Sequence, residues 1–102
     1  MDLECIKKEY LIKFKSEGSD KFYKSLLVCA VKELLKDTEE EKVNISLEFM
    51  NLHDKFMILF RREGDQQYLS IAKIFRKAAH KIYRFMLKRG WSEKNQKFLN
   101  VV

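Results

Sequence analysis

Residues 10–18 read YLIKFKSEG and residues 56–64 read FMILFRREG, so two nine-residue stretches of this chain resemble each other. Isoleucine, phenylalanine, glutamate and glycine are identical in their places, and an aromatic residue begins each stretch. The match continues past the glycines with a one-residue gap, since Tyr23 then aligns with Tyr68. Because similarity at a fixed spacing is the mark of a repeated structural unit, we interpret the chain as an internal duplication.

The residues before each glycine alternate in the way expected of a β-strand. In residues 10–14 and 56–60 every second side chain is aromatic or isoleucine, and in residues 43–49 apolar side chains alternate with polar ones. A two-residue period places successive side chains on opposite faces of a strand. We therefore expect strands at these three places, a hairpin turn at residues 51–54, and a shortened counterpart of the third strand at residues 1–5.

Beyond each glycine the apolar residues follow the spacing of an amphipathic helix. The first helix is expected to bury one stripe of side chains: Tyr23, Leu26, Leu27, Ala30, Val31, Leu34 and Leu35. The second helix is expected to bury the matching stripe: Tyr68, Ile71, Ala72, Phe75, Ala78, Ala79, Ile82 and Phe85. Asp20 and Asp65 are placed to cap the two helix N-termini, and Gly90 to end the second helix.

These elements predict an α+β fold in which two tandem strand–strand–helix repeats pack about a pseudo-twofold axis. A repeat of about 45 residues buries too little apolar surface to fold alone, so the repeats are expected to form one domain over residues 1–102. Residues 1–42 would form the first repeat with an acidic linker at 37–42, residues 43–90 the second repeat, and residues 91–102 a C-terminal tail with a helix or a final strand. Because the chain has no proline, an all-α bundle stays open as the alternative.

Composition excludes several classes of protein. With 102 residues, of which 46% are hydrophobic, the chain has the composition of a globular domain and not of a disordered segment. Its apolar runs are too short to cross a bilayer and it opens without an export signal, so we expect an intracellular protein with no membrane partner. Two histidines and two cysteines without ligand spacing predict no metal site, no cofactor and no enzyme. We expect Cys29 to pack in the core, His53 to lie in a solvated turn, and His80 to lie on the helix surface.

Three apolar residues have no place on the expected buried faces of the strands. Met57 and Leu59 alternate with the aromatic residues of their strand, and Leu11 is the matching position in the first copy. Exposed strands accept extended peptides through main-chain hydrogen bonds, and methionine adapts to varied side chains. The first functional hypothesis is therefore a protein–protein interaction module that binds a peptide or protein in the groove between the repeats. A homodimer would use the same surface.

The positive charge is concentrated in the second half of the chain. The formal net charge of +6 divides into −1 for residues 1–42 and +7 for residues 43–102. No acid occurs between Gln66 and Ser92, and six basic residues recur opposite the apolar stripe of the second helix: Lys73, Arg76, Lys77, Lys81, Arg84 and Lys88. A continuous basic face can neutralise a run of phosphates, so the second hypothesis is nucleic-acid binding directed at the backbone, with low sequence specificity. A merely solvated face and an acidic protein partner are the alternatives for these residues.

A resemblance to a known group of proteins adds to these expectations. In its length, its duplication and its composition rich in lysine, isoleucine and phenylalanine, the chain resembles the small proteins of the filamentous viruses of hyperthermophilic archaea, specifically Acidianus filamentous virus 1. The resemblance implies a protein that acts in the cytoplasm of an archaeal host or in the virion, without an assigned enzyme activity. It would also permit a disulfide between Cys5 and Cys29, since intracellular proteins of hyperthermophiles contain such bonds.

Overall fold

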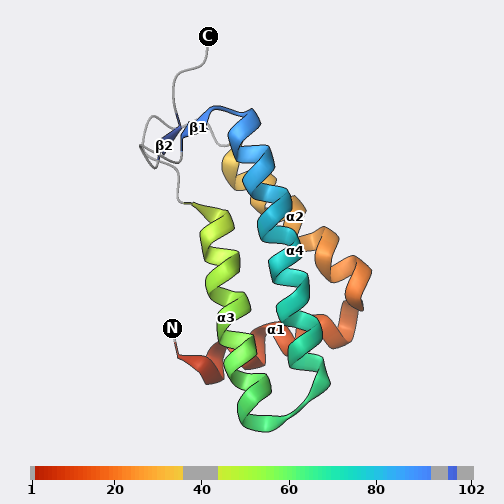
Figure 1. Cartoon of the computed structure of the whole chain (residues 1–102). Coiled ribbons are helices and arrows are strands. Elements are labelled where there is room, and N and C mark those ends of the chain that lie inside the picture. Colours follow the sequence, from red (N-terminus) through yellow and green to blue (C-terminus); the bar gives the residue numbers. More distant parts are fainter. Residues whose placement is uncertain (1, 36–43, 93–96, 99–102) are drawn as a thin grey trace.

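The structure is a computed structural model that describes residues 2–35, 44–92 and 97–98. These residues form four helices and one short pair of strands (Figure 1): α1 (Leu3–Glu17), α2 (Ser19–Leu34), α3 (Ile45–Glu63), α4 (Gln66–Lys88), β1 (Trp91–Ser92) and β2 (Lys97–Phe98). The strands pair antiparallel, with Trp91 opposite Phe98 and Ser92 opposite Lys97. The described chain is therefore an all-helical bundle with a two-residue ribbon after its last helix.

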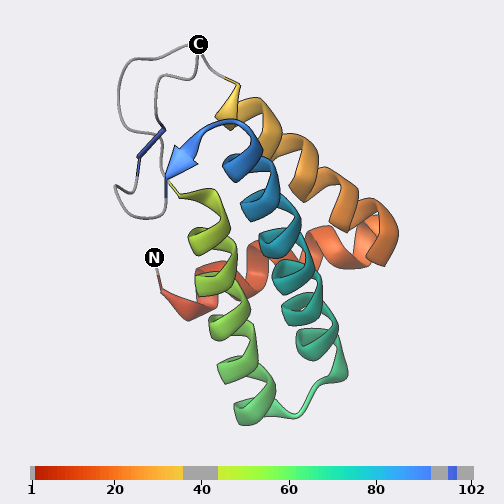
Figure 2. The same ribbon diagram turned by 45° about the horizontal axis from the view of Figure 1, so that its top comes forward.

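The four helices form two successive hairpins. α3 and α4 run antiparallel and side by side, and theirs is the most extensive helix–helix contact among the described residues. α2 packs on the other flank of α4, while α1 crosses behind α3 and α4 (Figures 1 and 2). α4 consequently lies between α3 and α2, and its outer face is not covered by any of the described helices.

Polar residues placed just before the helices explain where three of them begin. The side chain of Asp2 accepts a hydrogen bond from the amide of Cys5, Asn44 accepts one from Leu47, and Asp65 accepts one from Gln67. Such caps satisfy backbone N–H groups that have no partner within the helix. The predicted cap at Asp65 is confirmed, whereas the one at Asp20 is wrong, because α2 begins after Gly18. Asp20 lies in the first turn of α2 and pairs with Lys24 at 3.1 Å.

A cluster of aromatic rings holds the two hairpins together. Phe75 of α4 is fully buried, and four rings from the other three helices have centroids 5.1 to 5.9 Å from its own: Tyr10, Phe22, Phe49 and Phe56. Edge-to-face and stacked ring pairs at these distances stabilise a core beyond their area of contact. The core therefore draws on α1, α2, α3 and α4 together, and the hairpins form one folded unit.

The α+β prediction is wrong, and the all-α alternative describes the molecule. Residues 10–14 lie within α1, residues 56–60 within α3, and the described part of the third expected strand is the first turn of α3. The reason is that residues four apart share a face in a helix as well as in a strand. A strand would bury the middle residue of each alternating stretch together with its neighbours two positions away, whereas a helix turns that residue to the other side. Ile12, Leu47 and Ile58 are exposed at 61%, 55% and 44%, as the helix requires.

The remaining predictions of local structure have mixed outcomes. Residues 51–54 continue α3 and do not form a turn, and α1 occupies the place of the strand expected at the N-terminus. The acidic linker at 37–42 lies outside the described residues. The apolar stripe of α4 is confirmed, since every predicted member is buried except Phe85, which is half-buried. Both glycines of the repeated stretches end a helix with a positive φ, 81° at Gly18 and 73° at Gly64.

Candidate functional site

The outer face of α4 carries the six basic residues that the sequence singled out. All six side chains are exposed, and they lie on the side of the helix opposite its buried stripe: Lys73, Arg76, Lys77, Lys81, Arg84 and Lys88. At 1.5 Å of rise per residue the series extends about 22 Å along the helix axis. We call these six residues the basic face. Their predicted placement on one exposed surface is confirmed.

Acidic side chains pair with cations elsewhere in the molecule, not on the basic face. Nζ of Lys7 in α1 lies 3.0 Å from Oε1 of Glu63 in α3, and Arg62 lies 4.0 Å from Glu4. No carboxylate of the described residues forms an ion pair with the basic face. Lys77 instead places its ammonium 4.5 Å from the centre of the Tyr23 ring on α2. The basic face consequently keeps its positive charge uncompensated by described acids.

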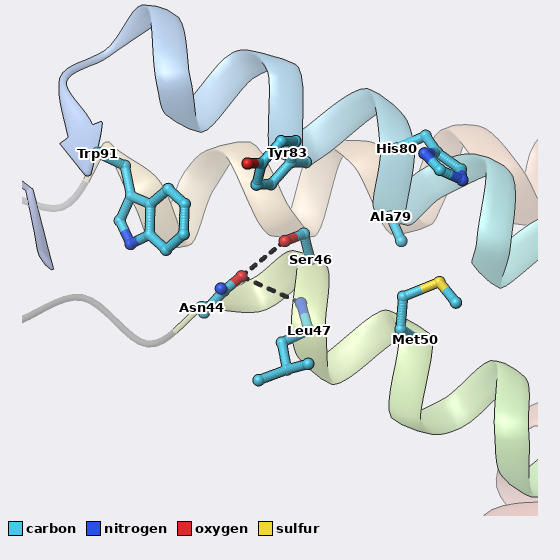
Figure 3. Close-up of a pocket in the computed structure, with 8 residues that line it drawn as sticks. All are labelled: Asn44, Ser46, Leu47, Met50, Ala79, His80, Tyr83 and Trp91. Carbon is cyan, nitrogen blue, oxygen red and sulfur yellow. Dashed lines mark hydrogen bonds between the residues drawn. The ribbon is translucent and has the colours of Figure 1, made fainter. Parts of the chain in front are cut away.

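A pocket of about 400 Å³ opens beside the basic face, between the first turns of α3 and the second half of α4 (Figure 3). Its lining is largely apolar and includes a few polar groups. Eight residues line it: Asn44, Ser46, Leu47, Met50, Ala79, His80, Tyr83 and Trp91. The α4 residues of the lining alternate along the chain with members of the basic face. A volume of this size is in the range that small ligands occupy.

The polar groups of the pocket are held in fixed orientations. Oδ1 of Asn44 accepts hydrogen bonds from the amide of Leu47 at 3.0 Å and from the hydroxyl of Ser46 at 2.6 Å (Figure 3). Trp91 is 3% exposed, and its ring packs edge-on against Tyr83 with centroids 5.7 Å apart. The indole Nε1 of Trp91 is buried, and no other described residue forms a hydrogen bond with it. A buried donor in this state costs free energy that an acceptor from a ligand would recover.

The three residues expected to bind a partner are not brought together on an exposed surface. Leu59 is fully buried in the core, while Leu11 and Met57 are half-buried and pack against it. The helical period places Leu59 near Phe56 on the buried side of α3, and not on the opposite side from it as a strand would. The exposed apolar residue of that segment is Ile58, which the strand prediction had placed in the core.

The cysteines and histidines also differ from expectation in places. Cys5 and Cys29 are both free and exposed, so the structure has no bond between them, and the core position expected for Cys29 is wrong. A hydrogen bond with Asp2 raises the pKa of the Cys5 thiol. His53 lies in α3, where its Nδ1 is 2.9 Å from Asp54. His80 is exposed as expected and stands at the mouth of the pocket.

Other kinds of site find no support in the part of the chain that the structure describes. No three histidine, cysteine or acidic side chains of residues 2–35, 44–92 and 97–98 are grouped so that they could hold a metal ion. None of the helices in these ranges is both long enough and apolar enough to pass through a bilayer.

The pocket was not predicted from the sequence, because it depends on how α3 lies against α4. One feature of the sequence nevertheless indicates where the pocket lies. Asn44 directly precedes apolar residues spaced as on a helix face, Ile45, Phe49 and Phe56, and this pattern marks a capped helix start. Once α3 is recognised as a helix, its N-terminus must lie near the C-terminal end of α4, where Tyr83 and Trp91 are found.

Comparison of the chain with protein-family models, with curated proteins and with solved structures found no match. The viral origin that the resemblance implies therefore stays a prediction.

Proposed function

We propose that this protein binds nucleic acid through the basic face of α4, by contacts to the phosphate backbone and with low sequence specificity. The observation that carries the proposal is a row of six exposed lysines and arginines along one helix with no described carboxylate paired to them. Lysine and arginine contacts to phosphates release condensed counterions and supply most of the affinity of non-specific binding.

The shape of the surroundings supports the same function. α4 is flanked by α2 and α3 and supported from behind by α1, so its outer face is held on a rigid element (Figure 1). A preorganised row of charges loses less conformational freedom on binding than charges on a loose segment. The length of the row, about 22 Å, is sufficient for several consecutive phosphates of one strand.

The charges of the other helices favour a role for α4 in particular. The exposed surface of α2 mixes signs, with Lys24 paired to Asp20 and Glu33 following Lys32. Mixed signs are the usual composition of a solvated face, whereas a face of one sign is typical of a surface that meets an oppositely charged partner. The proposal therefore concerns α4, and α2 serves as its internal control.

The test is fluorescence polarisation with labelled DNA, single-stranded and duplex, at about 50 and 200 mM KCl. Wild-type protein is expected to bind at the lower salt concentration and to weaken steeply at the higher one. A double variant, Arg76→Glu with Arg84→Glu, is expected to lose about tenfold or more in affinity, because it replaces two phosphate contacts with repulsion.

The matched control is Lys21→Glu with Lys32→Glu on α2, which changes the net charge by the same amount at two exposed positions. This control should retain affinity within about twofold. Equal losses in the two double variants, or no binding by wild type at low salt, would refute the proposal. If poly-glutamate of matched charge bound as tightly as the DNA with which it competes, the basic face would instead be assigned to an acidic protein partner.

A further inference from the structure

We infer that the nucleic acid bound by this protein is single-stranded, and that the pocket between α3 and α4 takes one unpaired base while the basic face holds the backbone. This inference rests on the proposed function and deepens it. It assigns a role to the pocket, which backbone binding alone leaves unexplained.

The pocket and the basic face are adjacent on α4. His80 lines the pocket mouth and is followed directly by Lys81, and Tyr83 inside the pocket is followed by Arg84. Successive residues of a helix are about 100° apart, so each of these pairs has one member in the pocket and the other on the basic face. A strand whose phosphates lie on the basic face thus has the pocket within reach of its bases.

The lining of the pocket suits the flat face of a base. The half-buried Tyr83 supplies an aromatic ring at one end, with the buried Trp91 packed edge-on against it, and Met50 and Ala79 add apolar surface (Figure 3). Every base can stack on an aromatic ring, and such stacking is the usual way in which single strands are bound without sequence preference. A paired base inside a duplex cannot enter a pocket of this kind without leaving its helix.

Two side chains of the pocket lining carry hydrogen-bond donors suited to the edge of a base, Trp91 and Asn44. The indole Nε1 of Trp91 is buried and has no hydrogen-bond partner among the described residues, so the indole must turn outward to donate to a ligand. The capping bonds hold Oδ1 of Asn44 toward α3, and the amide nitrogen lies on the side of the group away from these bonds (Figure 3). Bases carry carbonyl oxygens and ring nitrogens that accept such bonds. This buried donor, which lacks a partner in the described part of the chain, is the independent indication that the pocket accepts a polar ligand.

The experiment compares two single strands of equal length and equal phosphate number, oligothymidylate and the same backbone without bases. Trp91 is the sole tryptophan of the chain, so its fluorescence reports on the pocket directly. Wild type is expected to bind oligothymidylate about tenfold more tightly than the abasic strand. Its emission should be quenched by oligothymidylate and left unchanged by the abasic strand.

Two matched variants of α3 locate the effect. Leu47→Asp places a charge at the pocket, and Ile58→Asp places the same charge eleven residues further along the same exposed side of the helix. Both positions are exposed, so both variants should fold. Leu47→Asp is expected to abolish the preference for oligothymidylate over the abasic strand, and Ile58→Asp to keep it.

The outcomes separate this inference from the function on which it rests. Equal, salt-sensitive affinity for both strands without quenching of Trp91 would overturn the base pocket and leave backbone binding intact. Equal loss of preference in the two α3 variants would likewise overturn the pocket assignment. Failure of both strands to bind at low salt would overturn the proposed function itself.

Discussion

The two hairpins begin from similar sequences and reach different geometries. In each, the amide of the glycine donates to the carbonyl of the phenylalanine four residues earlier, Gly18 to Phe14 and Gly64 to Phe60. Gly64 then adopts the left-handed conformation, with ψ of 7°, and Asp65 starts α4, so that α3 and α4 return alongside each other. Gly18 has ψ of 169° and directly begins α2, which diverges from α1 (Figure 2). The ψ angle of the glycine and one additional linker residue, Asp65, therefore separate the tight hairpin from the crossed one.

The same comparison extends to charge and function. The second hairpin has the buried aromatic hub, the all-basic outer face and the pocket, whereas the first covers the flank and back of α4 and has mixed charges. If the basic face binds nucleic acid as proposed, the first hairpin would serve as its rigid support, because α1 and α2 both pack on α4. Several of the predictions below compare a change in one hairpin with a matched position in the other.

The largest effect is expected at the core. Phe75→Ala should lower the free energy of unfolding by about 3–5 kcal/mol, because it removes a fully buried ring and leaves a cavity at the contact of all four helices. Phe14→Ala in the first hairpin should cost clearly less, since Phe14 is half-buried. Urea denaturation followed by circular dichroism measures both. Comparable losses would show that Phe75 is not the point where the hairpins meet.

The glycine junctions should differ in their tolerance of asparagine. The φ and ψ of Gly18 lie in a region that only glycine adopts readily, so Gly18→Asn is expected to cost about 1–3 kcal/mol of stability. Gly64→Asn should cost less than about 1 kcal/mol, because asparagine tolerates the left-handed conformation. No atoms outside the neighbouring residues lie within 4 Å of an added Cβ at either site, so packing does not enter. The same denaturation experiment would contradict this account if the order of the two losses were reversed.

A smaller effect is expected at the start of α3. Asn44→Ala removes the cap on the amide of Leu47 and should destabilise the protein by about 1 kcal/mol. Asn44→Asp retains an acceptor and should restore most of the loss. Thermal unfolding of the three proteins measures the difference, and equal melting temperatures would show that the cap does not stabilise the helix.

The smallest effect concerns the ion pair between the hairpins. A hydrogen bond from Lys7 to the carboxylate of Glu63 raises the pKa of Lys7 above its ordinary value of 10.5. Because the folded-state pKa is raised, this stabilisation is fully present below the unfolded pKa and is lost as the pH rises through the folded value. The stability difference between wild type and Lys7→Met should therefore shrink above pH ~10.5, as measured by denaturation across that range. A difference that grows with pH would contradict the assignment.

The sequence was sufficient to predict α2 and α4 as helices, but not α1 and α3. The stripe of α4 contains adjacent apolar pairs such as Ala78 and Ala79, which fit a helix and conflict with a strand. In α1 and α3 the apolar residues happen to recur at spacings of two and four, and the spacing of four satisfies both structures. Local alternation therefore does not distinguish a helix from a strand in these segments. The helix is favoured by tertiary packing around Phe75, and the periodicity of the sequence carries no information about that packing.

The two parts of the candidate site also differ in whether the sequence could predict them. The basic face was predictable because its six residues lie on one helix, where spacing alone determines which side chains are neighbours. The pocket was not predictable, because Asn44, Tyr83 and Trp91 come together only through the antiparallel packing of α3 on α4. Leu59 was misplaced for a related reason, since its exposure was inferred from a strand that does not form.

The most direct test of the central claim is the salt dependence of affinity for a single-stranded oligonucleotide. If all six residues of the basic face contact phosphates, the logarithm of the association constant should fall against the logarithm of salt concentration with a slope of about −4. Arg76→Gln with Arg84→Gln should reduce that slope by about 1.4, and Lys21→Gln with Lys32→Gln on α2 should leave it unchanged. A slope near zero, or an equal change in both double variants, would contradict the role of α4.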